Sequence, residues 1–454
     1  MEKYVLLSAC LITFLCIFIL IGLNVALPTI AAEFGMNNIV QNWTSTIFFV
    51  CVAAFTIPIS QICGKYGCRK VFFVGTYIYA IGLLMTCFAN SAELYLVSRG
   101  MQGLGYAVYN VSLMSLLMLV VNENHRGRAM GICIFVCYIG YIITPAISGF
   151  LINNFGWRLI VYIGVISIIA IIILCTILIR GEWKSDEVEK LDYVGGLLFI
   201  IGLFPITYGI SDILSPMGLI SIVAGIIILI LFGIYEFRTK NPIFNMNLFK
   251  NKTFVAYIIT GFLFFFACYV YDTLFNYQLQ YVNGLNPEYA GMLLIIFPLF
   301  MAITTPIAGR ISDKVHPQKF STTGLVLLVV TLLFIYAFFG IGASIYAVAI
   351  AMILLGVSVG LFSVPNINAI ISSVPEENIP QATASEITLR SIGQTMSCAI
   401  LTLVFSMVVG NMALSTQNAG MVVSSTKTIC IISIVLAVIA IVFSLWGIKS
   451  EKNT

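Results

Sequence analysis

Four ionisable side chains lie within long apolar stretches of this sequence, where a charge is costly. They are Arg99, Asp272, Glu386 and Arg390. An ionisable group inside an apolar helix usually contacts a substrate, carries a proton or pairs with an opposite charge. These four residues are therefore the first candidates for chemistry in the chain.

Asp272 is the only carboxylate expected well inside a membrane-spanning helix. A carboxyl group withdrawn from water favours its neutral form, which suits reversible proton binding or contact with a cation. At helical spacing Asp272 shares a face with Phe265, Tyr269 and Asn276. We predict that these residues contact substrate and that Asp272 also carries protons. If the helix ends earlier, Asp272 lies instead in an outer vestibule.

Arg99 begins a second polar stripe, which continues with Gln102, Tyr106 and Asn110 at intervals of three and four residues. A stripe of this kind is expected to face a cavity rather than lipid. We predict that Arg99, Tyr106 and Asn110 contact substrate. The alternative is a structural arginine that is bonded to backbone carbonyls or reaches the outer surface.

Glu386 and Arg390 are four residues apart and can pair on one helical face. They are expected near the cytoplasmic end of their helix. A structural salt bridge or gate is therefore favoured over substrate contact, and Glu386 is a second candidate for proton coupling.

The composition shows which solvent surrounds these residues. Of 454 residues, 60% are apolar and only 9% are charged, and the mean hydropathy is +1.07. Soluble domains carry about 25% charged residues, so lipid must surround most of this chain. The twelve cysteines lie almost entirely in apolar runs without histidine-backed metal spacing. They are expected to be core residues, and no metal is expected.

Apolar runs long enough to cross a bilayer predict an all-α integral membrane protein with fourteen transmembrane helices. They cover 4–28, 41–63, 71–90, 94–120, 128–153, 157–180, 193–213, 215–236, 253–281, 287–309, 318–340, 344–372, 382–410 and 426–448.

The distribution of basic residues predicts the orientation. If the N-terminus is cytoplasmic, eighteen of the 22 bases fall on the cytoplasmic side. Only Arg158 and Lys427 fall outside, while Arg99 and Arg390 lie within helices. Cytoplasmic loops carry such an excess of lysine and arginine. Both termini are therefore expected in the cytoplasm.

Polar connectors divide the chain into two six-helix bundles with an additional helix pair between them. The charged run "GEWKSDEVEKLD" and the later segment "RTKNPIFNMNLFK" mark the divisions. The predicted units are an N-terminal bundle (1–180), a connector (181–192), the helix pair (193–236), a loop (237–252) and a C-terminal bundle (253–454).

Short motifs recur at corresponding places in the two bundles, which is typical of secondary transporters. "SQICGKYGCRK" (60–70) follows the second helix of the first half, and "GRISDKVHPQK" (309–319) follows that of the second. The expected fourth helix contains "RGMQGLG" and the fifth contains "GYIITPAISG".

These motifs together resemble the major facilitator superfamily, specifically its fourteen-helix drug:proton antiporter branch. The turn at 60–70 is similar to that family's loop signature through four matching residues, Lys65, Gly67, Arg69 and Lys70. Ser60 and Gly64 replace its first glycine and its aspartate, while the second copy keeps Gly309, Asp313 and Lys314. The resemblance extends to Arg99, Gln102, Gly103 and Gly105, and to the antiporter signature at Gly140, Pro145 and Gly149.

Physical reasons accompany the fifth-helix motif. Small residues spaced by four allow a neighbouring helix to approach closely, and Pro145 removes a backbone hydrogen bond so that the helix can bend. Ordinary tight packing, with no part in coupling, is the alternative explanation.

The resemblance implies a secondary active transporter that exports amphipathic or drug-like compounds in exchange for protons. It implies gating or structural roles for Lys65, Gly67, Arg69, Gln102, Gly140, Pro145, Gly149 and Asp313. The branch usually carries an aspartate in its first helix, but the corresponding residues here, Ile17 to Ile19, are apolar. The chain therefore resembles a divergent member of this branch. A transporter of a specific anionic metabolite or lipid, coupled without a first-helix carboxylate, is the alternative.

Other classes fit the sequence poorly. An enzyme would need converging catalytic groups, yet the two histidines, His125 and His316, lie in expected loops, and no nucleotide-binding loop is present. We therefore expect no cofactor. The energy for transport is expected to come from an ion gradient. The expected partners are the lipid of the cytoplasmic membrane and a small molecule. A multi-pass monomer without nucleic acid is expected.

Overall fold

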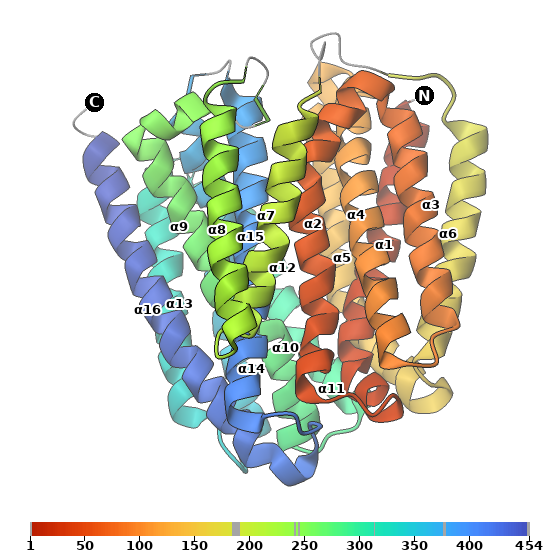
Figure 1. Cartoon of the computed structure of the whole chain (residues 1–454), viewed down its shortest axis with the longest axis vertical. Coiled ribbons are helices and arrows are strands. Elements are labelled where there is room, and N and C mark those ends of the chain that lie inside the picture. The colour runs from red at the N-terminus through yellow and green to blue at the C-terminus, as the bar shows by residue number, and fades with distance from the viewer. Residues whose placement is uncertain are drawn as a thin grey trace.

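The protein is a bundle of long helices that lie nearly side by side (Figure 1). The computed structural model describes residues 2–183, 191–239, 242–243, 246–312, 314–375 and 378–451. Within these ranges, fourteen helical segments are long and apolar enough to cross a membrane. The predicted all-α fold with fourteen spans is confirmed.

The first eight spans are single helices. Their bounds are Glu2–Glu33 (α1), Asn38–Tyr66 (α2), Cys68–Cys87 (α3), Ala92–Val120 (α4), Glu123–Phe155 (α5), Arg158–Leu178 (α6), Tyr193–Ser211 (α7) and Pro216–Glu236 (α8). Helix α1 continues through Pro28 to Glu33, beyond the expected end of the first span at residue 28.

The ninth and tenth spans are interrupted. The ninth consists of α9 (Lys252–Cys268), α10 (Tyr271–Tyr277) and a π-helical turn (Gln278–Val282). The tenth consists of α11 (Pro287–Leu294) and α12 (Ile296–Ser312). The remaining spans are α13 (Pro317–Phe338), α14 (Ile345–Ser372), α15 (Ile379–Val409) and α16 (Ala419–Glu451).

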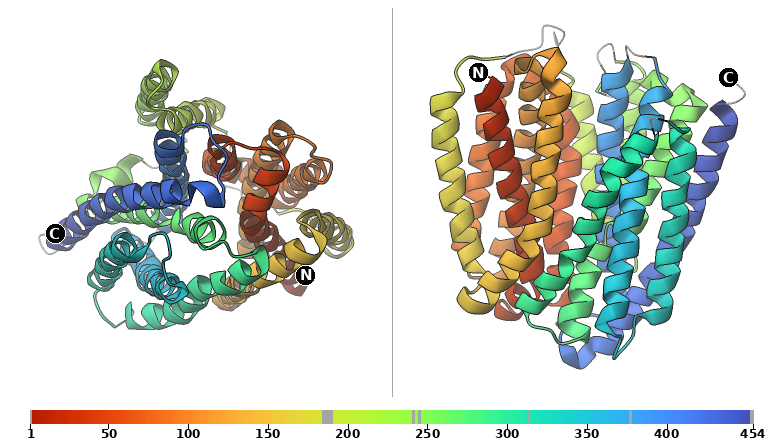
Figure 2. Two further views of the ribbon diagram at one scale, coloured as in Figure 1. Left: turned by 90° about the horizontal axis from the view of Figure 1, so that it is seen from below. Right: turned by 180° about the vertical axis from the view of Figure 1, so that it is seen from behind.

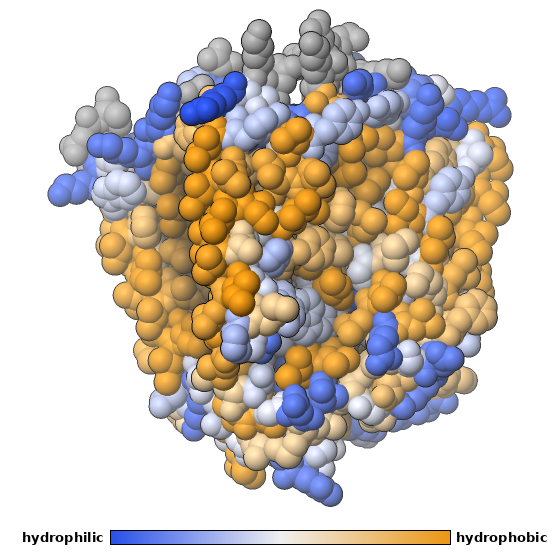
Figure 3. All heavy atoms as spheres, in the orientation of Figure 1, coloured by the Kyte–Doolittle hydropathy of each residue, from blue (hydrophilic) through white to orange (hydrophobic). Residues whose placement is uncertain are grey.

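Both chain ends lie at the same end of the bundle (Figure 1). We call this end the terminal face and the opposite end the distal face. On the face that Figure 3 shows, apolar side chains cover most of the middle of the molecule, and polar side chains gather at the two ends. Such an apolar middle is what a hydrocarbon layer requires of a protein surface.

The helices form two groups when they are seen from the distal face (Figure 2). Helices α1 to α6 make one group and α9 to α16 the other, and the groups meet where α2 packs on α15 and α5 packs on α11. Helices α7 and α8 pack on each other outside both groups, and α7 contacts both α2 and α15. The predicted residue boundaries of the domains stay a prediction.

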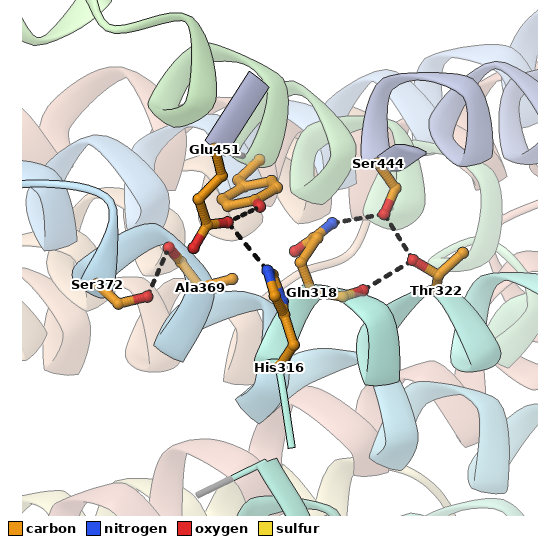
Figure 4. Close-up of polar contacts among 8 residues, drawn as sticks. His316, Gln318, Thr322, Ala369, Ser372, Ser444 and Glu451 are labelled. Atoms are coloured by element: carbon orange, nitrogen blue, oxygen red, sulfur yellow. Dashed lines mark hydrogen bonds and ion pairs between the residues drawn. The ribbon is translucent and has the colours of Figure 1, made fainter. Parts of the chain in front are cut away.

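The last helix is fastened at the terminal face (Figure 4). The Glu451 carboxylate pairs with Nε2 of His316 at 3.1 Å and accepts a hydrogen bond from the Tyr257 hydroxyl. The Gln318 amide donates to Ser444 Oγ at 2.7 Å. These contacts tie α16 to α9 and α13.

Candidate functional site

A cavity of about 440 Å³ lies between the two helix groups. We call it the main cavity. Residues of α2, α4 and α15 supply most of its wall, from mid-height toward the terminal face. Its polar lining comprises Thr56, Ser60, Asn110, Ser115, Thr388, Arg390, Ser391 and Gln394.

Aromatic rings form much of the rest of this wall. Phe49 meets Tyr269 edge to face with ring centres 4.9 Å apart, and Phe48 lies 5.7 Å from Tyr106. Tyr141 of α5 also lines the cavity. Rings of this kind offer flat apolar contact with a polar edge.

A second and much smaller space, of about 40 Å³, lies on the distal side of these rings. We call it the polar chamber. Asn24, Thr44, Arg99, Asp272 and Thr273 are among its lining residues. It shares Leu20, Phe49, Tyr141 and Tyr269 with the main cavity, so these side chains form a partition between the two.

The polar stripe of α4 is divided by this partition. Arg99 lines the polar chamber, whereas Tyr106 and Asn110 line the main cavity. The Arg99 side chain is only 4% exposed. Its Nη1 donates to Gln102 at 2.6 Å, and its guanidinium lies 4.8 Å from the centre of the Phe48 ring. Gln102 therefore holds Arg99 and does not face a cavity.

Asp272 of α10 lines the polar chamber and contacts the opposite helix group. The Asn24 amide of α1 donates to its Oδ2 at 2.7 Å. Because these residues belong to different halves of the molecule, this hydrogen bond joins the two halves. Asp272 carries the only carboxylate among the residues that line the polar chamber or the main cavity.

Further polar contacts close the distal side between the halves. The amide of Gln41 donates to Tyr281 at 3.0 Å, and the Tyr277 hydroxyl donates to Asn42 at 2.8 Å. Asn38 donates to two carbonyls beyond α15. We call these contacts, together with those of Asn24, the distal seal.

Two predicted substrate residues lie outside both spaces. Asn276 is fully buried in the distal seal, where its amide donates to the Asn24 carbonyl at 2.7 Å. Phe265 packs against Phe362, with ring centres 6.4 Å apart. Tyr269, in contrast, lines both spaces.

Glu386 and Arg390 of α15 are paired, with Arg390 Nε 3.5 Å from Glu386 Oε1. Arg390 also lines the main cavity, but Glu386 does not. The Arg390 guanidinium lies 5.7 Å from the centre of the Phe265 ring. The pair therefore lies at the wall of the main cavity, and its role as a structural salt bridge or gate stays a prediction.

Part of the glycine and proline motif of α5, at Pro145 and Gly149, lies where the two halves meet. A Cβ atom on Gly149 would come within 2.3 Å of the Pro287 carbonyl, and one on Gly291 within 2.2 Å of the Pro145 carbonyl. Gly140 lies against Ile17 of α1. The small residues thus allow backbones of opposite halves to touch.

The basic turn between α2 and α3 is contacted by an acidic side chain from a distant part of the sequence, Glu182. Oε1 of Glu182 accepts a hydrogen bond from the backbone N–H of Arg69 at 2.9 Å. The same carboxylate lies against Gly67, whose φ of +102° requires glycine. Arg69 Nε donates to the Ile179 carbonyl, while Lys65 lies over Tyr66. Asp313, for which the resemblance implies a gating or structural role, lies outside the described residues.

Sequence reasoning missed Asn24, Gln41, Asn42 and Glu182. The first three are amides within otherwise apolar runs, which is a usable signal because an amide in hydrocarbon needs a partner. Their partners are distant in sequence and could not be inferred. No group of three or more histidine, cysteine or acidic side chains that could hold a metal ion occurs in the described ranges.

Comparison with known proteins agrees with this architecture. The family model of the Major Facilitator Superfamily matches residues 9–395 and again residues 257–453. The riboflavin transporter RibZ of Clostridioides difficile is 25% identical over 424 residues, covering 92% of each chain. The multidrug resistance protein Stp of Mycobacterium tuberculosis is 26% identical over 384 residues, covering 83% of this chain and 71% of Stp.

Solved structures share the fold. A bacterial homologue of the human lysosomal transporter Spinster superposes with a TM-score of 0.71 at 15% identity, covering 99% of this chain and 97% of that one. A POT family transporter in complex with 5-aminolevulinic acid gives a TM-score of 0.74 at 16% identity, with coverages of 97% and 96%. The family model spans almost the whole sequence, and the fourteen helices and the two packed halves agree with it. The chain belongs to the major facilitator superfamily of transporters.

Proposed function

We propose that this protein is a secondary active transporter that exports amphipathic organic compounds by alternating access, driven by protons that bind Asp272. The observation that carries the proposal is the hydrogen bond between Asn24 and Asp272. The carboxyl group of Asp272 can bind and release a proton, and it lies at a contact between the two halves. In alternating access these halves must move relative to each other.

Protonation of Asp272 would act on this contact directly. An ionised carboxylate only accepts hydrogen bonds, whereas a protonated one also donates. The side-chain amide of Asn24 donates to Asp272, and the backbone carbonyl of Asn24 accepts a hydrogen bond from Asn276, which lies in the same half as Asp272. A change of charge on Asp272 therefore alters the distal seal, which must open for release on that side.

The main cavity supports a small organic cargo. Its volume of about 440 Å³ lies in the range of pockets that hold drug-sized ligands, about 300–1,000 Å³. Its lining combines aromatic rings with hydroxyl and amide groups. Two relatives are named for multidrug resistance or efflux and one for riboflavin transport, which supports cargo of this size.

The proposal also includes the setting of the protein. It would lie in the cell membrane as a monomer, in contact with lipid and a small molecule but not with nucleic acid. An ion gradient would supply the energy, without a bound cofactor. The bacterial relatives support a cell membrane.

Transport in proteoliposomes with an imposed pH gradient tests the proposal. Fluorescein and rhodamine 6G serve as organic cargoes, and Asp272→Asn is compared with wild type. We expect the gradient to drive at least one dye, and the variant to retain a tenth of that rate or less. Asp212→Asn makes the same change outside both spaces and should transport normally.

Two results would contradict the proposal. If the gradient has no effect on either dye in the wild-type protein, proton-driven export of such compounds is wrong. If Asp272→Asn responds to the gradient as wild type does, protons are carried elsewhere.

A further inference from the structure

We propose that the main cavity binds its cargo through an anionic group on a planar ring, and that Arg390 receives this group. The inference rests on the proposed transport function, because it names the chemical class of the cargo. It assigns Arg390 to ligand binding, although pairing with Glu386 alone would make it a structural residue.

The first observation is the charge of the lining. Arg390 is the one charged side chain among the residues that line the main cavity, all of which lie in the described ranges. The other polar lining groups are neutral hydroxyls and amides, such as Ser60, Asn110 and Gln394. An anion in this cavity therefore meets one cation, and a cation meets no carboxylate.

The second observation is the unused hydrogen-bonding capacity of Arg390. A guanidinium has five N–H donors in a fixed fork, and here only Nε lies close to Glu386, at 3.5 Å. The terminal Nη groups make no hydrogen bond to any residue that the structure describes. The Arg390 side chain is 33% exposed, compared with 7% for Glu386.

This geometry presents a donor fork to the cavity. Glu386 and the ring of Phe265 hold the guanidinium from behind, and the free edge can bind two oxygens of a carboxylate, sulfonate or phosphate side by side. The charge of Glu386 offsets part of the attraction without blocking that edge.

The other buried ions do not compete for the cargo. Arg99 is 4% exposed and donates to Gln102, and it lines the polar chamber rather than the main cavity. Asp272 also lines the polar chamber, on the distal side of the partition. The site for the proton and the site for the cargo are therefore separate.

The aromatic wall indicates the rest of the ligand. Phe48, Phe49, Tyr106, Tyr141 and Tyr269 all line the cavity. Aromatic side chains favour stacked or edge-to-face contact with other rings. A flat ring that carries an acidic group matches both features of the wall.

Binding of two dyes to the purified full-length protein in detergent tests this inference. Fluorescein and rhodamine 6G share a xanthene ring but carry opposite charge, and fluorescence anisotropy gives both dissociation constants. Fluorescein should bind at least about tenfold more tightly, the size expected of a charge-assisted hydrogen bond. Arg390→Gln should weaken fluorescein binding by a similar factor and leave rhodamine 6G unchanged.

Matched variants separate ligand contact from folding. Arg180→Gln removes the same charge from an exposed position outside the cavity and should bind fluorescein normally. Glu386→Gln keeps the arginine and removes its offsetting charge, so fluorescein should bind about two- to fivefold more tightly. If Arg390→Gln fails to fold because Glu386 is left unpaired, the double variant Glu386→Gln/Arg390→Gln replaces it and should show the same loss.

The inference is overturned if rhodamine 6G binds as tightly as fluorescein. It is also overturned if no substitution at Arg390 changes the dissociation constant of fluorescein. These measurements need no gradient. Binding of fluorescein that depends on Arg390, without gradient-driven transport, would contradict the proposed function alone. Proton-driven transport that ignores dye charge would contradict only this inference.

Discussion

At the scale of single residues, the hydrogen bond between Asn24 and Asp272 joins the proposed proton site to the closure of the distal side. Asn24 donates to the carboxylate through its amide and accepts from Asn276 through its carbonyl. One side chain and its own backbone thus connect the halves at two points. A substitution at Asn24 should therefore weaken the other contacts of the distal seal as well.

Replacement of Asn24 by alanine is expected to loosen the distal seal. The variant loses a hydrogen bond to a carboxylate, which contributes about 1.5–3 kcal/mol in proteins. Hydrogen–deuterium exchange of peptides covering 38–46 and 277–283 should therefore accelerate about tenfold or more. Exchange of the basic turn at 60–70 should not change.

Asn154→Ala is the matched control. Asn154 is an exposed asparagine that donates only within its own helix, to the Phe150 carbonyl. Its replacement should leave exchange at the distal seal unaltered. Equal exchange in the Asn24 and Asn154 variants would show that the seal does not depend on Asn24.

The sequence was informative about which residues matter and less so about their partners. Asp272 and Arg99 could be singled out because a charge is rare in an apolar run. The partition that separates them from Tyr106 could not be predicted, since it forms only where side chains of α1, α2 and α5 meet Tyr269, which directly follows α9. Helical spacing placed Asn276 beside Asp272, but the structure turns its amide toward the Asn24 carbonyl.

At the scale of helices, the close approach of α5 and α11 sets how the halves fit on the distal side. Gly149 faces the Pro287 carbonyl, and Gly291 faces the Pro145 carbonyl. Two reciprocal glycines at one crossing let the backbones touch over a full turn. This contact explains why small residues are needed here.

Gly149→Ala should destabilise the protein, because the added Cβ would lie 2.3 Å from a backbone oxygen that cannot rotate away. Crowding of this kind costs about 1–3 kcal/mol, and the midpoint of thermal unfolding in detergent should fall. Gly131→Ala lies in the same helix with open space around the added atom. It should leave the midpoint unchanged or raise it, since alanine favours helix.

Equal midpoints for the two variants would mean that α5 and α11 separate easily. Transport of the two dyes by Gly149→Ala provides a second measurement, because a looser distal contact should also change its rate relative to Gly131→Ala.

The number of spanning helices follows from the sequence because each needs a long apolar run. Their internal breaks do not follow. The run 253–281 reads as one helix, yet α9 ends at Cys268 and a π-helical turn begins at Gln278. Neither glycine nor proline marks these positions, so no local signal was available. Contacts with the other half, such as those of Tyr277 and Tyr281, accompany this irregular backbone.

At the scale of the whole molecule, the shared position of the two termini gives the positive-inside prediction a physical test. Eighteen of the 22 lysines and arginines fall in loops or helix ends on the side of the N-terminus, which is the terminal face. Cytoplasmic loops carry such an excess of basic residues. We therefore expect the terminal face to be cytoplasmic, with the distal seal on the outside.

Protease digestion of tagged protein checks this orientation. A tag after the C-terminus should be cut in inverted membrane vesicles and protected in intact spheroplasts. A tag inserted after Ile341, in an exposed distal loop with free space around its glycines, should behave in the opposite way. Digestion of the C-terminal tag in spheroplasts would reverse the assignment of the two faces.

The additional helix pair limits the routes by which a compound can reach the proposed cargo site. Apolar side chains of α7 fill the groove between α2 and α15, where Leu203 packs with Val50 and Met396, and where Phe199 packs with Ile57 and Phe232. A compound dissolved in the membrane leaflet therefore meets the outer surface of α7 and α8 on that flank, not the Arg390 wall. On this flank, high lipid solubility therefore gives a compound no direct route to Arg390.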